Sequence, residues 1–354
     1  MAQSPTITQR KQDHIQALLD DPLIERQSDF DQIRLVHRAL PELNFAQVDS
    51  TSEFLGKPLR FPFLISSMTG GAADNLQQIN RHLAEAAEAC QVAMAVGSQR
   101  AMIQDSQAAA SFALRAYAPN IPLIANVGAV QLNYGYGESQ LRRALDVLQA
   151  DALYLHLNPL QERIQPEGDQ NFAALAEKIA RLAEKIEQPI ILKEVGSGLS
   201  PQDIQLGLQA GVRWFDLAGR GGTSWSRIEA HRGNPDQGIL FQDWGLTTCE
   251  ALVLAQPFLK EANLIASGGI RSGIDMLKAV ILGAKLCGVA APLLRPALDS
   301  TEAVIAEIER FEQSFKTGQF LLAIEKLADL HFNSDLILQS PWHPLARHLR
   351  QFSD

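Results

Sequence analysis

Residues 189–210 have the sequence PIILKEVGSGLSPQDIQLGLQA, which contains the parts of one strand–helix unit in order. The apolar run at 189–194 has the length and composition of a buried strand. A glycine-rich turn at 196–198 follows, and residues 201–210 then place their apolar side chains at helical spacing. A strand buried on both faces and followed by a crossover helix indicates a parallel sheet.

The same pattern recurs along most of the chain. The predicted strands are 61–66, 92–96, 122–126, 152–157, 189–194, 213–217, 264–267 and 286–290. Helical periodicity lies between them at 75–90, 139–149, 171–186, 201–210 and 272–282. This alternation predicts a (β/α)8 TIM barrel, an α/β fold. An open, doubly wound sheet is the alternative, but the chain has neither the GxGxxG nor the GxxxxGK[ST] motif that would favour it.

Three regions extend beyond a minimal barrel. We expect a single domain over residues 1–354, with an N-terminal arm at 1–60, a barrel core at 61–315 and a C-terminal helical extension at 316–354. The stretch at 219–245, after the sixth strand, is too long and too rich in Gly, Trp and Arg for a plain loop. Such a segment is expected to build or cover a functional site.

The composition is that of a globular, acidic protein. The 354 residues are 46% hydrophobic and 20% charged, with a net charge of −9. This balance lacks the basic surface expected of a nucleic-acid binder. Cys90, Cys249 and Cys287 lie far apart without a CxxC motif, which argues against a zinc knuckle or a dithiol redox site. We see neither a secretory signal nor an apolar run of roughly 18 residues, so we expect a cytoplasmic protein that does not bind membranes.

Polar and glycine-rich motifs follow the predicted strands, where barrel enzymes carry their active sites. In chain order they are SSMTGG (66–71), GSQR (97–100), NVGA (126–129), HLNPLQE (156–162), KEVGSG (193–198), DLAGRGGTSW (216–225) and SGGIRSG (267–273). We therefore expect the functional site at the carboxyl ends of the strands.

Two of these motifs suit a phosphorylated cofactor. The glycines of SGGIRSG allow a phosphate to approach backbone N–H groups, and the turns after strands seven and eight often bind phosphate in this fold. Lys193, at the end of a strand, could simply point to solvent. At the mouth of a barrel it could instead hold the electron-rich edge of flavin mononucleotide (FMN), near N1 and O2 of the ring.

The motif HLNPLQE concentrates polar groups at one strand end. His156, Asn158, Gln161 and Glu162 lie within seven residues, which favours a site over a lone core histidine. Glu162 offers one carboxylate, and Mg²⁺ commonly takes one or two protein carboxylates together with water and substrate phosphate. A zinc site is not indicated, because no His or Cys partner lies at ligand spacing.

Basic residues could hold a diphosphate. Arg100, with the Ser98 hydroxyl beside it, is well placed for bidentate phosphate contacts. Arg10 and Lys11 are further candidates, although alone they would be interpreted as a solvated charge pair. His156 is a possible fourth member.

Together with RKQDHI at 10–15, these motifs resemble type 2 isopentenyl diphosphate isomerase, an FMN-dependent family. The resemblance covers nearly the whole chain; HLNPLQE, GSQR and AGRGGTSW are specific in combination, whereas SGGIR is common among FMN barrels. It implies interconversion of isopentenyl and dimethylallyl diphosphate, with a requirement for Mg²⁺ and for FMN reduced by NADPH. Reduced FMN would serve as acid and base. It also implies a cytoplasmic homo-oligomer, a tetramer or an octamer.

The resemblance assigns roles residue by residue. It implies FMN contacts from Ser67, Met68, Thr69, Ser98, Asn126, Lys193, Thr223, Gly269, Ile270, Arg271, Ala290 and Ala291. It implies substrate contacts from Arg10, Lys11, Ser98, Gln99, Arg100, His156, Asn158 and Gln161. Gln161 and His156 are the catalytic candidates, and Glu162 is the Mg²⁺ ligand. The chain departs from the family at GLTT (245–248), where the family tends to have a proline.

Three other functions fit the sequence less well. An FMN-dependent 2-hydroxy acid oxidase would need a His in an HGGxR-like run after strand seven, where this chain has ASGGIR (266–271). An enzyme resembling inosine monophosphate dehydrogenase would need a nucleophilic Cys after strand six; Cys249 sits in TTCEA, typical of a helix start, and is expected to be structural. A non-catalytic flavin-binding barrel would have no reason to keep Arg100, His156, Gln161 and Glu162 together.

Overall fold

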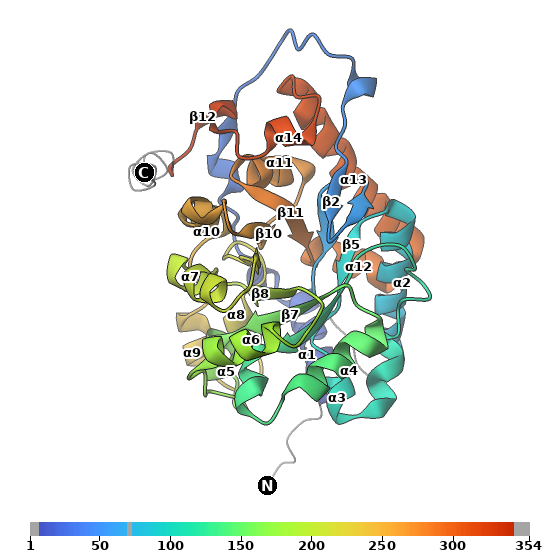
Figure 1. The fold of residues 1–354 in the computed structure, drawn as a ribbon, viewed down its shortest axis with the longest axis vertical. Helices are drawn as coiled ribbons and strands as arrows, with labels where there is room; N and C mark the ends of the chain where they lie inside the picture. Colours follow the sequence, from blue (N-terminus) through green and yellow to red (C-terminus); the bar gives the residue numbers. More distant parts are fainter. Residues whose placement is uncertain (1–6, 69–72, 343–354) are drawn as a thin grey trace.

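Eight parallel strands close into a barrel in the computed structural model (Figure 1). The structure describes residues 7–68 and 73–342, and all their side chains except those of residues 7–12 and 74. In barrel order the strands are β4 (Phe63–Ile65), β5 (Ala93–Ala95), β6 (Leu123–Gly128), β7 (Ala152–Leu157), β8 (Ile190–Glu194), β9 (Trp214–Asp216), β10 (Asn263–Ser267) and β11 (Ala284–Val289). Each predicted strand coincides with one of these, so the predicted barrel is confirmed.

Most of the helices surround the strands on the outside of the barrel (Figure 1). The helices are α1 (Ile7–Asp20), α2 (Asp74–Cys90), α3 (Arg100–Gln104), α4 (Glu138–Leu148), α5 (Pro159–Ile164), α6 (Leu175–Ala183), α7 (Pro201–Gln209), α8 (Trp225–Ala230), α9 (Pro235–Leu240), α10 (Thr248–Ala255), α11 (Gly273–Ile281), α12 (Ala291–Asp299), α13 (Thr301–Leu321) and α14 (Leu327–Leu330). Helices α1 and α8 contribute to a cavity at the mouth of the barrel. Local sequence fixes several starts: the Ser200 hydroxyl accepts the Asp203 N–H, while the Asp203 carboxylate accepts the Ser200 N–H.

Most predicted helices coincide with observed ones, but the helix predicted at 171–186 is shorter. It begins only at Leu175. The side chain of Asn171 accepts the backbone N–H of Ala173, and Ala174 adopts a left-handed conformation with φ of 54°. This local side-chain bond competes with helix formation and delays the start.

The barrel interior is filled by alternating side chains and closed at its amino-terminal end. Residues such as Leu64 and Tyr154 point inward, whereas their neighbours along the strands pack against the helices. The antiparallel hairpin of β2 (Ser52–Phe54) and β3 (Lys57–Leu59) joins the interior cluster, and the Phe54 ring lies 4.9 Å from that of Trp214, the first residue of β9. Because the amino-terminal end of the barrel is closed, the carboxyl ends of the strands are open for a site.

The C-terminal part of the chain packs on the barrel. Helix α13 lies against α2 and α11 (Figure 1). The division predicted between the barrel core and the C-terminal extension, at 315–316, falls inside this helix. After α13 and α14, strand β12 (Ile337–Gln339) pairs antiparallel with β1 (Arg34–Leu35) from the N-terminal arm. Within the described ranges, no helix combines the length and apolar character needed to cross a bilayer.

Candidate active site

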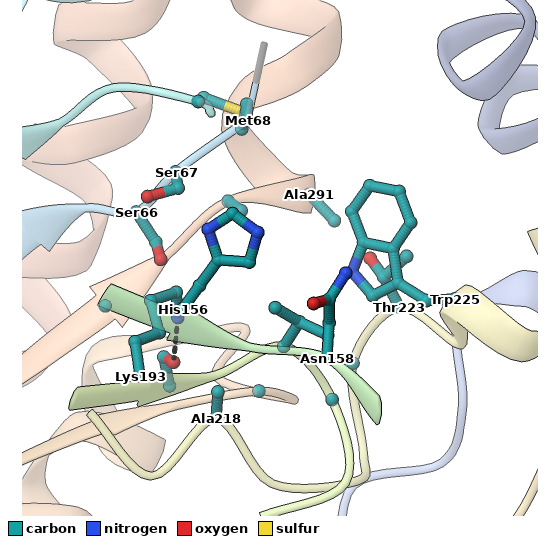
Figure 2. Close-up of a pocket in the computed structure, with 18 of the residues that line it drawn as sticks. Ser66, Ser67, Met68, His156, Asn158, Lys193, Ala218, Thr223, Trp225 and Ala291 are labelled. Carbon is teal, nitrogen blue, oxygen red and sulfur yellow. Dashed lines mark hydrogen bonds between the residues drawn. The ribbon is translucent and has the colours of Figure 1, made fainter. Parts of the chain in front are cut away.

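A cavity opens at the carboxyl ends of the barrel strands, where the motifs predicted it (Figure 2). Figure 2 shows His156 near its centre, with Ser66–Met68 on one side, Asn158 and Trp225 on the other and Lys193 below. The predicted site residues that line it are Ser67, Met68, Ser98, Arg100, Asn126, His156, Asn158, Gln161, Glu162, Lys193, Thr223, Gly269, Ile270, Arg271, Ala290 and Ala291. One cavity therefore gathers residues from all eight strand ends.

Four predicted residues are not placed in the lining. Gln99 is fully buried behind it, where its side chain accepts the Asn126 N–H and donates to the Ala144 carbonyl, both over 2.9 Å. The Gln99 side chain therefore links β6 to α4 by hydrogen bonds and does not line the cavity. Thr69 lies outside the described residues. Arg10 and Lys11 lie on α1, but their side chains are also outside the described part.

The floor of the cavity carries an ion pair. Lys193 Nζ donates to Oδ2 of Asp216 over 2.8 Å and to Oγ of Ser267 over 3.3 Å. The Ser267 hydroxyl in turn donates to Oδ1 of Asp216, and the Tyr154 hydroxyl donates to Oδ2 over 2.8 Å. Because neighbouring strands supply these four side chains, the barrel itself fixes the position of the lysine.

Glycines form much of one wall and allow two turns to approach closely. A Cβ on Gly268 would lie 2.1 Å from the Gly219 carbonyl oxygen, and one on Gly269 would lie 2.7 Å from the Gly221 oxygen. Both glycines have positive φ, 96° and 77°. The amino-terminal end of α12, at Ala291, lines the same cavity and adds the positive end of its dipole. This wall suits a phosphate and the flat face of a ring.

His156 is held by a chain of hydrogen bonds. Its Nδ1 lies 2.7 Å from Oδ1 of Asn126, whose Nδ2 donates to Ser67 Oγ and to the Val96 carbonyl. The network assigns the ring proton to Nδ1, since the facing amide oxygen can only accept. At the Nε2 end, a Cβ on Gly128 would lie 3.1 Å away, so glycine leaves room for the ring.

Glu162 and Arg100 meet through Asp169. The carboxylate of Glu162 accepts from Asn158 Nδ2 and from the Asp169 N–H, and Arg100 Nη1 donates to Asp169 Oδ2 over 2.8 Å. Burial raises the pKa of Glu162; these donors lower it only in part. Two buried atoms, Arg100 Nε and Asn158 Oδ1, have no hydrogen-bond partner among the described residues. A bound anion would accept the hydrogen bond of Arg100 Nε, and a bound cation, or water held by it, would contact Asn158 Oδ1.

Gln161 is oriented from the side of the N-terminal arm. Its Nε2 donates to Oε1 of Glu229 over 2.9 Å, and the same oxygen lies 3.2 Å from His14 Nε2. Arg232 pairs with the other oxygen over 2.7 Å. Burial raises the pKa of Glu229, but the bonds from His14 and Gln161 and the charge of Arg232 outweigh it and hold the pKa below its ordinary value. Helix α1 thus reaches the site through His14.

Cys249 lies outside this cavity. It is fully buried on α10, whose start is capped by Thr247. Burial raises the pKa of its thiol well above the ordinary value, the opposite of what a nucleophile needs.

Comparisons with known proteins agree with this geometry. Residues 12–121 and 137–337 match the sequence profile of the FMN-dependent dehydrogenase family. The chain is 65% identical over 343 residues to isopentenyl-diphosphate delta-isomerase of Hydrogenovibrio crunogenus, covering 96% of this chain and all of the relative. The chain belongs to the isopentenyl-diphosphate delta-isomerase family. A second member, from Paracoccus zeaxanthinifaciens, is 57% identical over 338 residues, which are 93% of this chain and 97% of that one.

Solved structures show the fold that this isomerase-family chain shares. The flavin-binding domain of baker's yeast flavocytochrome b2 superposes with a TM-score of 0.67 at 17% identity, covering 92% of this chain and 83% of that one. (S)-Mandelate dehydrogenase superposes with a TM-score of 0.63 at 14% identity, covering 95% and 99%. At these identities the likeness is one of fold alone.

Sequence reasoning missed the residues that position the site in this isomerase-family chain. Asp169 contacts Arg100, Glu229 contacts Gln161, and His14 contacts Glu229, yet none of these three partners stands at a predicted strand end. Asp216 and Ser267 do stand at strand ends, but no role was assigned to them. Their position at the strand ends could have identified them as candidate site residues.

Proposed function

We propose that this protein interconverts isopentenyl diphosphate and dimethylallyl diphosphate as an FMN-dependent isomerase in isoprenoid biosynthesis. The observation that carries the proposal is the 65% identity with a relative of that name over the relative's whole length. The cavity at the carboxyl ends of the strands, where barrel enzymes carry their active sites, supports it.

The residues present fit FMN. The glycine turns at 219–222 and 268–269 and the start of α12 offer backbone N–H groups to its phosphate. Lys193 is the cation at the floor, suited to negative charge on the reduced ring. When bound and reduced, FMN supplies a group that can give and accept a proton, so that the double bond moves without net oxidation.

Arg100 and His156 are proposed to hold the diphosphate. The unpaired Nε of Arg100 can donate to a phosphate oxygen while Nη1 stays on Asp169. His156 lies near the centre of the cavity, where its ring can contact a bound diphosphate. A fixed diphosphate keeps the carbon skeleton in one orientation.

Glu162 is proposed to bind Mg²⁺ together with diphosphate oxygens and water. Among the described residues, no group of three His, Cys, Asp or Glu could hold a metal ion by itself. One buried carboxylate beside the unpaired Oδ1 of Asn158 suits an ion that completes its shell from the substrate. Burial raises the pKa of Glu162, and a dication bound beside the carboxylate would offset this effect by favouring the ionised form.

Gln161 is proposed to act at the reacting carbon atoms. Its amide is a poor base, but Glu229 fixes its orientation, so it can position the alkene or a proton-carrying group. From the family likeness we further propose NADPH as the reductant, a cytoplasmic location and a homo-oligomer of four or eight chains, each a single barrel domain.

An anaerobic assay tests the function. Protein is supplied with FMN, Mg²⁺ and isopentenyl diphosphate, with and without NADPH or dithionite, and dimethylallyl diphosphate is measured. Product that forms only when the flavin is reduced is the expected result. Protein that binds and reduces FMN but forms no product would contradict the substrate while leaving the flavin site intact.

A further inference from the structure

We propose that Asp216 is a positioning residue that controls how strongly Lys193 stabilises negative charge on the bound flavin ring, and that Tyr154 moderates Asp216. The proposal rests on FMN binding, which is part of the proposed function, but it does not depend on isomerisation. Neither Asp216 nor Tyr154 lines the cavity, so both act through the lysine.

The geometry places one buried anion beneath one cation. Tyr154, Lys193, Asp216 and Ser267 stand on β7, β8, β9 and β10, which are consecutive strands of the barrel. Lys193 and Asp216 are paired across β8 and β9, so their side chains leave the sheet at the same level. Lys193 and Ser267 reach the cavity, and Asp216 is completely buried below them.

Burial makes this pair electrostatically strong. The Asp216 carboxylate receives Lys193, Tyr154 and Ser267, so each of its oxygens has a donor. In a low-dielectric interior two charges 2.8 Å apart interact much more strongly than in water. The field that Lys193 presents to the cavity is therefore the field of an ammonium partly neutralised by Asp216. A negatively charged ring above Lys193 and the carboxylate below it compete for the same cation.

Tyr154 is placed to weaken the attraction of the Asp216 carboxylate for Lys193. Its hydroxyl donates to Oδ2, the same oxygen that Lys193 contacts, and Lys193 Nζ lies 5.5 Å from the centre of its ring. Burial and then the charge of Asp216 raise the pKa of Tyr154 well above its ordinary value, so the hydroxyl keeps its proton and remains a donor. The bond spreads the carboxylate charge and leaves more of the ammonium's field for the cavity.

The test uses the FMN-bound protein and reads the flavin directly. Asp216→Asn, Tyr154→Phe and Lys193→Met are each reduced anaerobically, and the fraction of anionic reduced FMN is followed by absorbance across pH, with the midpoint potential as a second reading. Asp216→Asn removes the competing anion and should shift the ionisation equilibrium about tenfold toward the anionic ring. Tyr154→Phe strengthens the competition and should shift it about threefold toward the neutral ring.

Opposite directions separate this role from a structural one. A carboxylate that only stabilised the barrel would loosen the site in both variants and move the flavin in the same direction. The effect of Asp216→Asn should also largely disappear when Lys193 is replaced by Met, because it acts through that residue. Shifts of the same sign, no shift in Tyr154→Phe, or an undiminished Asp216→Asn effect in the Lys193→Met background would each overturn the proposal.

Two features keep the experiment decisive. Tyr154→Phe retains the buried ring, so we expect it to fold even if Asp216→Asn does not. Glu312→Gln is the matched control, because Glu312 is also a buried carboxylate in an ion pair, with Arg60 on the outside of the barrel, and it should leave the flavin unchanged. No isopentenyl diphosphate is needed, so a failed isomerase assay would not affect these readings.

Discussion

Gln161 and Glu229 are 68 residues apart in the chain, yet the Gln161 amide donates to the Glu229 carboxylate over 2.9 Å. The carboxylate is completely buried and is also contacted by His14 and Arg232. A side-chain amide can rotate by half a turn and exchange its donor and acceptor at little steric cost. The bond to Glu229, together with the bond that the Gln161 oxygen accepts from Asn158 Nδ2 over 3.0 Å, removes this ambiguity, so the Gln161 oxygen has one defined direction.

Replacing Glu229 by Gln should therefore reduce turnover. The variant keeps its size but loses the charge that fixes the Gln161 amide, and we expect kcat to fall about 10- to 100-fold with little change in KM. Steady-state kinetics on the FMN-bound protein check this. Glu167→Gln, which removes the second partner of Arg232, is the control and should stay within about twofold of wild type. A larger effect on KM than on kcat would contradict the positioning role.

Arg100 should be required as an arginine. One of its nitrogens holds Asp169 and another is unpaired at the cavity, and a lysine cannot make both contacts. Arg100→Lys should raise KM for isopentenyl diphosphate by about tenfold or more while FMN affinity is unchanged. Asp169→Asn should cause a smaller rise, because Arg100 keeps its charge but loses its anchor. An unchanged KM in Arg100→Lys would exclude Arg100 from diphosphate binding.

Glu162→Gln tests the metal. If Glu162 binds Mg²⁺, the concentration of Mg²⁺ needed for half-maximal activity should rise at least about tenfold, because the ion loses its protein carboxylate. FMN absorbance should stay normal, since the flavin contacts lie elsewhere in the cavity. An unchanged Mg²⁺ titration would remove Glu162 as a ligand.

The barrel could be predicted from the sequence because strands buried on both faces consist of short runs of apolar residues. The run at 152–157 matches β7 at both ends, and the four polar residues of the motif at 156–162 line the cavity. Prediction failed where a side chain competed with the backbone. The Asn171 side chain accepts the Ala173 N–H just before α6, and periodicity alone cannot show that bond.

Only part of the site could be predicted from the sequence, for a different reason. Strand ends can be located from one sequence, so the positions of Lys193, His156 and Glu162 at the cavity could be predicted. Their partners depend on which strands become neighbours and on how the long loop folds back. Asp216 acquires its role only because β8 and β9 lie side by side, and Glu229 acquires its role only because α8 packs against α5.

Glu194 should make stability depend on pH. One of its oxygens accepts the N–H groups of Val195, Gly196 and Ser197, but complete burial outweighs them and raises its pKa to about 7 from an ordinary 4.5. The folded chain thus holds an extra proton between these values. The stability that this proton contributes is present at low pH and is lost as pH rises through that window, by up to about 3 kcal/mol.

Glu194→Gln isolates that contribution, because it keeps an acceptor for the three N–H groups but cannot ionise. Between about pH 5 and pH 8 the wild-type protein should lose more unfolding free energy than the variant does, as measured by urea denaturation. Parallel pH profiles for the two proteins would show that Glu194 titrates normally. Each sample should carry the same flavin content, since bound ligand adds its own stabilisation.

Cys249→Ser separates a structural thiol from a nucleophile. The residue is fully buried on α10, its thiol pKa is raised, and it lies outside the cavity, so activity per folded molecule should stay within about twofold of wild type. The serine hydroxyl enters an apolar environment and should cost about 1–3 kcal/mol of unfolding free energy. Both quantities are measured on one preparation, with activity normalised to bound FMN. A folded, flavin-loaded variant without activity would instead identify Cys249 as part of the chemistry, because lost stability alone cannot inactivate molecules that remain folded.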